Sequence, residues 1–305
     1  MPPDPSSQTI IVQLNQNAGF WSNVNRAVNR LALSIGRNGI AALRIDWRID
    51  PANQVSPYGT AADGNLWEKY FEPIEFESFP ATETIVSSYA DRQMTGLRAY
   101  YMYKTDRNWR QRYHTAYTRY IRLKPQVQQQ VTAVYERQMA GKFCVGVHFR
   151  NSFHGSLECP EPNLPLDDYL SRTRAQLADR SGGVLVLATD VAEAVDRFHA
   201  EFGDQLIYQT QVLRSRRDGD HEVFGRHQSP SVQWGLDVLI DCLLLAKCNS
   251  LLHVTSNIAT AAGYINPNLK MIYCERSPVL GMLHYWQKLG NHLLTPRLKR
   301  VFSAR

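Results

Sequence analysis

Two kinds of apolar periodicity alternate along this chain of 305 residues. Short apolar runs that are typical of strands are followed by longer stretches in which apolar residues recur every three to four positions, as on one face of a helix. In the first part of the chain this spacing predicts strands over residues 9–14 and 40–46, with a helix over residues 20–35 between them. A strand–helix–strand order indicates a parallel βαβ unit.

The alternation is more regular after Gly141, which ends a helix that Pro125 begins. Strands are predicted over residues 143–149, 184–188, 206–208, 251–254 and 271–274, and helices over residues 166–177, 192–202, 234–248, 258–264 and 278–293. Strands that alternate with helices indicate a second parallel sheet, covered on both faces. The sequence therefore predicts an α/β fold of two Rossmann-like domains whose parallel sheets face a cleft that holds the ligand.

The simplest division of the chain has three parts. We expect one domain over residues 1–140, a second over residues 141–277, and a helix with a basic tail over residues 278–305 that packs back toward the first domain. The segment 98–124 is rich in Arg and Tyr. Aromatic residues recurring every three to four positions there predict helices packed on a domain surface, and a nucleic-acid platform is the alternative.

The charge balance favours anionic ligands. Lys and Arg number 34 against 28 Asp and Glu, a net charge of +6, which suits phosphates without requiring nucleic acid as a partner. No run of about 20 apolar residues occurs, so we expect no stable membrane insertion, while peripheral contact with a membrane stays open. The first eight residues lack the basic region and the apolar region of a signal peptide, so we do not expect them to be one. The five Cys are scattered without a CxxC pair, which predicts buried reduced thiols and a reducing compartment, the cytoplasm.

Residues that follow predicted strands are the first site candidates, because ligands of open parallel sheets bind beyond the carboxyl ends of the strands. His148 and Arg150 end one strand and share one side of it by its two-residue period. The guanidinium of Arg150 is permanently charged and can contact two oxygens of a diphosphate at once. A surface ion pair for Arg150 and a structural role for a buried His148 are the alternatives.

The loop after this strand carries His154 and Glu158. Glu158 can take a proton as a general base while Arg150 stabilises a leaving phosphate. His148, His154 and Glu158 could instead ligate a metal, but nothing in their spacing fixes a geometry, so we expect none.

Three further junctions carry polar residues. Asp190 follows a buried strand and suits either a hydrogen bond to a nucleoside or a cap on the next helix. Asp241 lies in an otherwise apolar helix, so its carboxylate needs donors such as a purine edge or an Arg. Thr255, Ser256 and Asn257 open a helix, where hydroxyl and backbone N–H groups either bind phosphate or cap the helix.

Several motifs are absent. The chain has no P-loop, no strand-linked GxGxxG and no GxSxG, which weakens kinase, dehydrogenase and hydrolase functions. One DxD, Asp218 and Asp220, lies in a polar loop without a preceding apolar strand, and we interpret it as solvated. Arg214 and Arg226 beside it either help to hold an anion or are solvated as well.

The order of these features resembles the C-terminal domain of GDP-fucose-dependent fucosyltransferases, above all the α1,6-fucosyltransferases including the bacterial nodulation type. The resemblance is strongest over residues 143–275, and it is carried by HFR at 148–150, Glu158, Tyr169, VLATD at 186–190 and the segment 235–257. It implies a GT-B fold and an inverting transfer of fucose from GDP-fucose to a glycan acceptor, with no metal or other cofactor. The alternatives are a different donor, such as UDP-xylose, and a nucleotide-sugar- or glycan-binding protein that has lost catalysis.

The resemblance also implies a role for each candidate. Arg150 matches the arginine that holds the donor diphosphate, with His148 as its partner, and Glu158 matches the carboxylate that activates the acceptor hydroxyl. By the same resemblance Asp190 lies near the nucleoside and Asp241 near the guanine.

Further residues follow from the same comparison. Ser256, with Thr255 and Asn257 beside it, matches the serine-rich phosphate turn of those enzymes. The first domain would face the acceptor. Asn23 lies in a segment, residues 19–23, that loosely resembles the glycine-rich strand-to-helix turn of those enzymes. It is an acceptor-side or loop candidate, together with Tyr169 and Arg226.

The sequence departs from the family immediately after its arginine. Where the motif usually continues to an Asp and a Lys, this chain has Phe153 and His154. His154 is therefore the candidate for the basic partner of Glu158, which would make activity more sensitive to pH.

Overall fold

The computed structural model describes residues 8–14, 18–34, 42–53, 56–74, 83–87, 107–150, 164–215, 229–254 and 256–274. The helix and basic tail predicted over residues 278–305 lie outside these ranges.

The N-terminal part contains the predicted βαβ unit. Strand β1 (Gln8–Gln13), helix α1 (Phe20–Ser34) and strand β2 (Ala42–Asp46) follow one another, and β1 and β2 pair in parallel. Strand β3 (Glu83–Ser87) pairs in parallel with the other edge of β1, which gives a sheet of order β2-β1-β3. The periodicity of the sequence does not predict β3. The short helix α2 (Trp67–Tyr70) lies between β2 and β3.

The second sheet is parallel throughout and has five strands in the order β6-β5-β4-β7-β8. Its strands are β4 (Cys144–Phe149), β5 (Val184–Thr189), β6 (Leu206–Ile207), β7 (Ser250–His253) and β8 (Lys270–Tyr273). The chain runs outward from β4 through β5 to β6 and then returns to the other side of β4 with β7. Strand order therefore reverses between β4 and β7, and ligands of doubly wound sheets bind at such a point.

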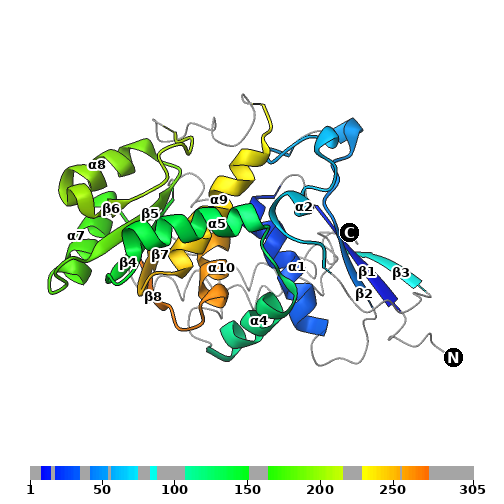
Figure 1. Ribbon diagram of the computed structural model, residues 1–305, viewed down its shortest axis with the longest axis horizontal. Helices are drawn as coiled ribbons and strands as arrows, with labels where there is room; N and C mark the ends of the chain where they lie inside the picture. The colour runs from blue at the N-terminus through cyan, green and yellow to red at the C-terminus, as the bar shows by residue number, and fades with distance from the viewer. Residues whose placement is uncertain are drawn as a thin grey trace, which may run out of the picture.

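Helices cover both faces of this sheet, as the sequence predicts (Figure 1). The helices are α5 (Pro125–Val134), α7 (Leu166–Leu177), α8 (Ala192–Phe202), α9 (Val232–Ala246) and α10 (Asn257–Ile265). Val145 and Leu185 point to the face covered by α7 and α8, whereas Cys144 and Val184 point to the face covered by α5, α9 and α10. This alternation is the two-residue period of a strand buried on both sides.

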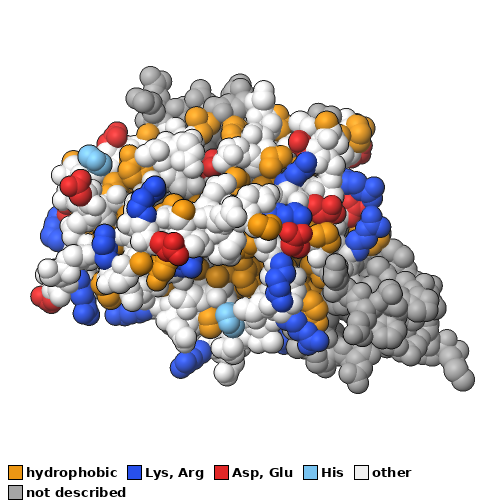
Figure 2. All heavy atoms as spheres, in the orientation of Figure 1, with side chains coloured by type: hydrophobic (Ala, Val, Ile, Leu, Met, Phe, Trp, Pro, Cys, Tyr) orange, Lys and Arg blue, Asp and Glu red, His pale blue; other side chains and the backbone are white. Residues whose placement is uncertain are grey.

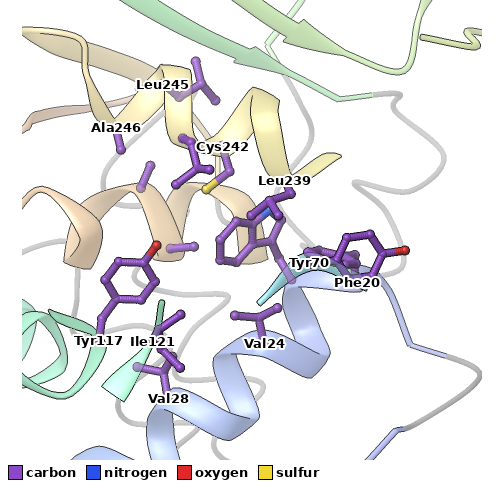
Figure 3. Close-up of a cluster of buried hydrophobic side chains, with 14 of the residues drawn as sticks. Phe20, Val24, Val28, Tyr70, Tyr117, Ile121, Leu239, Cys242, Leu245 and Ala246 are labelled. Carbon is purple, nitrogen blue, oxygen red and sulfur yellow. The ribbon is translucent and has the colours of Figure 1, made fainter. Parts of the chain in front are cut away.

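One apolar core joins the two sheets. It runs from α1 across α9 and α10 to the five-stranded sheet. Figure 3 shows Val24 and Val28 of α1 pointing toward Leu239 and Cys242 of α9. Helices α4 (Arg107–Tyr120) and α5 precede residue 141 and also pack on α10 and α9. The division of the chain at residue 140 stays a prediction.

Within the Arg- and Tyr-rich segment, residues 107–120 form α4, and several of its side chains serve packing. Tyr113 and Tyr117 are buried with their rings near Tyr264 of α10. Arg110 and Arg112 donate to the backbone carbonyl oxygens of Leu269 and Ala32 at 2.9 and 3.1 Å. The rings of Tyr113 and Tyr117 are therefore not available for stacking on bases, and in this described part of the segment they have a structural explanation.

The described cysteines are free and buried, as predicted: Cys144, Cys242, Cys248 and Cys274. Cys159 lies outside the described residues. Among the helices that the structure describes, none is both long and apolar enough to span a bilayer. Basic and acidic side chains lie interspersed on the face of the molecule shown in Figure 2.

Candidate active site

A cavity lies at the carboxyl ends of β4 and β5, where α1 and the loop after β2 approach the second sheet. It contains about 930 Å³ of empty space, its open mouth included. Its lining comes from both halves of the chain: Phe20, Trp21, Pro57, Tyr58, His148, Arg150, Ala188, Thr189, Asp190, Val212, Leu213, Trp234, Asp237, Val238, Asp241, Asn257 and Ile258. The cleft predicted between the two halves is thus present.

His148 and Arg150 form the part of the lining that ends β4. In the sheet His148 pairs with Ala188 of β5, so the ends of the two strands lie level. His148 is 3% exposed, and its Nδ1 lies 3.1 Å from the Oγ of Ser256. Burial, helped by the nearby charge of Arg150, lowers the pKa of His148 to about 3. The imidazole is therefore neutral at physiological pH, and Arg150 is the cation at this end of the cavity.

The N-terminus of α10 lies beside these two residues. Ser256 caps the helix, because its Oγ accepts a hydrogen bond of 3.0 Å from the backbone N–H of Ala259. Asn257 and Ile258 line the cavity with the first turn of the helix, whose N–H groups have no intrahelical acceptors. Such a turn binds anions. Both sequence interpretations of this segment therefore have support, since the Ser256 side chain caps while the turn itself faces the cavity.

Helix α9 presents two carboxyl groups to the cavity on successive turns. Asp237 and Asp241 are buried and line the cavity. The Nε2 of Gln209 donates to the Oδ1 of Asp241 at 2.6 Å and to the backbone oxygen of Asp237 at 2.8 Å. The Nε2 of Gln233 donates to the Oδ1 of Asp237 at 2.8 Å. The expectation that Asp241 must have a donor is confirmed, with Gln209 as that donor.

Burial controls the charge of this acidic pair. It raises the pKa of Asp241 to about 7, against the opposing effects of the Gln209 hydrogen bond and of Arg214. It raises the pKa of Asp237 as well. Arg214 donates to the backbone oxygens of Gln209 and Val212 at 2.8 and 3.0 Å. Arg214 is thus half-buried close to this acidic pair and hydrogen bonded to the backbone, and its interpretation as simply solvated is wrong.

Asp190, directly after β5, also lines the cavity. Helix α8 begins after Val191 without a side-chain cap, and the N–H of Val191 donates instead to the Oγ1 of Thr189 at 3.1 Å. The capping interpretation of Asp190 is therefore wrong. Asp190 lines the cavity next to Thr189, as the interpretation near a nucleoside requires.

The first half of the chain contributes an aromatic wall. Trp21 of α1 donates from its Nε1 to the backbone oxygen of Val238 at 3.0 Å, which ties this wall to α9. The rings of Phe20 and Tyr58 pack edge to face at 5.6 Å. This wall lacks charge, so it suits the less polar part of a ligand.

Two predicted site residues lie away from the lining. Asn23 is 1% exposed, and its amide donates to the backbone oxygens of Ala18 and Gly19 at 3.3 Å each. Tyr169 is buried in the core on the α7 face, with its ring against Phe149. Both serve the local structure here, and neither is among the residues that line the cavity.

Four predicted site residues lie outside the described residues, namely His154, Glu158, Arg226 and Thr255, as does the DxD of Asp218 and Asp220. Their roles stay predictions. Within the part of the chain that the structure describes, no three His, Cys, Asp or Glu side chains form a group that could hold a metal ion.

Sequence reasoning missed one acid and the aromatic wall. Asp237 precedes Asp241 by one helical turn in an apolar helix, and this spacing was a usable signal because it puts both carboxyl groups on one face. No local pattern marks Phe20, Trp21 and Tyr58 as site residues, because their position depends on how the two sheets pack.

The lining combines a cation and N–H donors, from the end of β4 and the start of α10, with the carboxyl acceptors of α9. Such a cavity fits a ligand with an acceptor-rich anionic part and a separate part that carries donors.

Two parallel sheets with a ligand cavity between them define a GT-B-like α/β fold, as the sequence predicts. Solved structures share it. NodZ α-1,6-fucosyltransferase co-crystallized with GDP is 18% identical, with a TM-score of 0.51 over 83% of this chain and 91% of that chain. Fucosyltransferase NodZ from Bradyrhizobium is 19% identical, with a TM-score of 0.52 over 83% of this chain and 90% of that one.

A structure of POFUT1 in complex with GDP is more distant, at 11% identity and a TM-score of 0.47 over 89% of this chain and 99% of that chain. At these identities the two NodZ structures establish the fold, and the predicted fucosyltransferase-like architecture is confirmed. No protein-family model matches the sequence, and no curated protein matches it.

Proposed function

We propose that the protein is an inverting, metal-independent glycosyltransferase that moves fucose from GDP-fucose to a hydroxyl of a glycan acceptor. One observation carries the proposal: a single cavity joins a cationic, donor-rich end to a buried pair of carboxyl groups. The structures that share the fold, an α-1,6-fucosyltransferase co-crystallized with GDP among them, support it.

The cationic end suits a diphosphate. Arg150 can fork onto two phosphate oxygens, and the first turn of α10 adds backbone N–H groups beside it. These groups neutralise the charge that a departing diphosphate develops, in the role that a divalent ion plays elsewhere. Asp190 also lines the cavity, and its carboxylate would accept from ribose hydroxyl groups.

The acidic end suits guanine better than uracil. Guanine carries an N1–H and an N2 amino group side by side, and a carboxylate can accept from both. The corresponding edge of uracil has one N–H between two carbonyl oxygens, which would face the carboxyl groups of Asp237 and Asp241. Among nucleotide sugars, this end of the cavity therefore favours a GDP-sugar over a UDP-sugar.

The reaction is a single displacement. The acceptor oxygen forms a bond to C1 of the sugar while the bond from C1 to the diphosphate oxygen breaks, and its electron pair leaves with GDP. Glu158 takes the proton of the acceptor hydroxyl, and His154 is its basic neighbour. These two roles rest on the resemblance of the sequence. The buried free thiols fit a cytoplasmic setting.

A nucleotide titration tests the proposal. A ligand at 100 times its Kd stabilises a protein by about 2.7 kcal/mol, so GDP should raise the melting temperature well above the value with equal UDP. Slow hydrolysis of GDP-fucose should accompany binding. Preference for UDP would instead indicate a UDP-sugar donor, and binding without hydrolysis or transfer to any glycan would indicate a binding protein. No stabilisation by either nucleotide would overturn the proposal.

A further inference from the structure

Two side chains lie behind the cavity wall and contact residues that line it. Ser256 hydrogen bonds to His148, and Asn25 of α1 hydrogen bonds to Asn257. We propose that Ser256 and Asn25 are positioning residues that fix His148 and Asn257 as N–H donors toward the cavity. The inference deepens the proposed function, because it assigns these donors to the diphosphate.

The first hydrogen-bond chain starts at a group that can only donate. The backbone N–H of Ala259 donates to the Oγ of Ser256 at 3.0 Å, and the Oγ lies 3.1 Å from the Nδ1 of His148. Ser256 is 1% exposed. If Nδ1 carried a proton, this hydroxyl would accept twice and its own hydrogen would be buried without an acceptor, which is costly.

The Ser256 hydroxyl therefore donates to Nδ1, and the proton of the neutral ring is on Nε2. Burial keeps the ring neutral, since it lowers the pKa of His148 to about 3. Because His148 lines the cavity and its Nδ1 is engaged, the Nε2–H is the donor left for a ligand.

The second hydrogen-bond chain starts at a backbone carbonyl oxygen, which can only accept. The backbone oxygen of Asn257 lies 3.1 Å from one side-chain atom of Asn25, which must therefore be the amide nitrogen. The same nitrogen lies 3.1 Å from a side-chain atom of Asn257, which must be its Oδ1. The Oδ1 of Asn25 is held in turn by the hydroxyl of Tyr264 at 2.9 Å.

This order leaves the Nδ2 of Asn257 as the polar atom that is not engaged by Asn25. Asn257 lines the cavity, so this amide nitrogen is available there as a donor. Burial raises the pKa of Tyr264 well above its usual range, so its hydroxyl keeps the proton that orients Asn25.

As a consequence, the N–H donors of His148 and Asn257 are oriented toward the cavity before a ligand binds. A diphosphate offers only acceptors, and both His148 and Asn257 could otherwise turn a lone pair toward it. The two chains exclude those orientations, so no reorganisation is needed on binding. Arg150 supplies the charge, and the two neutral side chains supply hydrogen bonds.

Nitrogen-15 NMR of the ligand-free, full-length protein with labelled histidine tests the first chain without reference to any reaction. The wild type should show the His148 signals of the Nε2–H form. Ser256→Thr keeps both the cap and the hydroxyl and should preserve this form. Ser256→Asp keeps a capping oxygen but can only accept, so the proton should move to Nδ1. An Nδ1–H signal of His148 in the wild type would overturn the assignment. An Nε2–H form that persists in Ser256→Asp would overturn it as well.

A double-mutant cycle read with inorganic pyrophosphate and with GDP tests the second chain. Asn25→Ala and Asn257→Ala should each weaken binding about tenfold, and the double variant should bind no worse than Asn257→Ala alone. Additive losses would show that Asn25 does not act through Asn257 and would overturn its role. If wild-type protein binds pyrophosphate but not GDP, the proposed function fails, whereas the assignment of His148 and Asn257 as donors to a diphosphate is retained. If it binds neither, the assignment of these donors to a diphosphate fails.

Discussion

Tyr70 packs directly against Gly235, and this contact joins the first part of the chain to α9. A Cβ atom on Gly235 would lie 2.6 Å from the Cζ of Tyr70 and 3.1 Å from a ring carbon of Phe20. The hydroxyl of Tyr70 lies 3.0 Å from the backbone oxygen of Val232 and 3.2 Å from that of Tyr58, which accept from it. The glycine therefore allows the aromatic wall to reach the start of α9.

Gly235→Ala should destabilise the protein although alanine favours helix. The propensity gain is about 1 kcal/mol, whereas forcing a methyl group into packed surroundings costs about 1–3 kcal/mol and here meets two ring systems. Because Phe20 lines the cavity, GDP affinity should fall as well. Gly263→Ala in α10 is the control, since its Cβ would have no neighbour nearer than 3.4 Å. Urea unfolding that ranks the two variants equally would contradict this account.

The binding of GDP should release protons near neutral pH. Burial raises the pKa of Asp241 to about 7, and the donors of guanine favour the ionised carboxylate. Between pH 6 and pH 8 the ionised fraction rises about tenfold, and affinity should rise with it. Calorimetry in buffers of different ionisation enthalpy measures the protons directly. Asp241→Asn should bind GDP more weakly and without this pH dependence, and an unchanged dependence in that variant would assign it to another group.

His148 should make the folded state sensitive to acid. Its pKa is about 3 in the folded protein and about 6.5 in an unfolded chain. Between these values the unfolded chain binds the extra proton, so the free energy of unfolding falls as the pH drops from about 6.5 to about 3. His148→Gln should reduce that slope in pH-dependent urea unfolding. Replacement of the exposed His199 by Gln is the control, and a slope unchanged in His148→Gln would refute the assignment.

Arg150→Lys should lower the turnover of GDP-fucose by about 10²–10³-fold, because lysine keeps the charge but cannot contact two oxygens at once. Stopped assays with labelled donor measure the rate. Arg174→Lys on α7, which alters a surface ion pair with Glu201, should leave turnover unchanged. Full activity in Arg150→Lys would show that the departing diphosphate is held elsewhere.

Glu158→Gln should lower transfer by about 10²–10⁴-fold, the usual contribution of a general base. GDP affinity should stay at the wild-type value, because the amide has nearly the shape of the carboxyl group. The matched control is Glu193→Gln on the exposed side of α8. If transfer persists in Glu158→Gln, His154 is the next base to replace.

Most elements of the second sheet could be predicted, because each strand and helix there buries a regular pattern of its own. The helices over residues 166–177 and 192–202 coincide with α7 and α8. Strand β3 could not be predicted in the same way. It has five residues and is defined by its pairing with β1, far away in the sequence.

The site divides along the same line. His148, Arg150, Asp190 and Asn257 could be found because parallel strands bring their carboxyl ends to one edge. Asp241 could be found because a carboxylate in an apolar helix needs donors. The aromatic wall could not, since it depends on the close approach at Gly235.

The hydrogen bonds from Asn25 to Asn257 could not be predicted either. They join α1 to α10, and neither helix carries a motif that indicates the other.

Among the described residues, the apolar interior shared by α1, α9 and α10 is continuous between the two halves. A hinge opening would have to expose Val24 and Leu239 to water, so we expect the proposed nucleotide to enter and leave through the mouth of the cavity while the two halves stay packed together. For the same reason both sheets should unfold together on heating, and calorimetry should show a single peak.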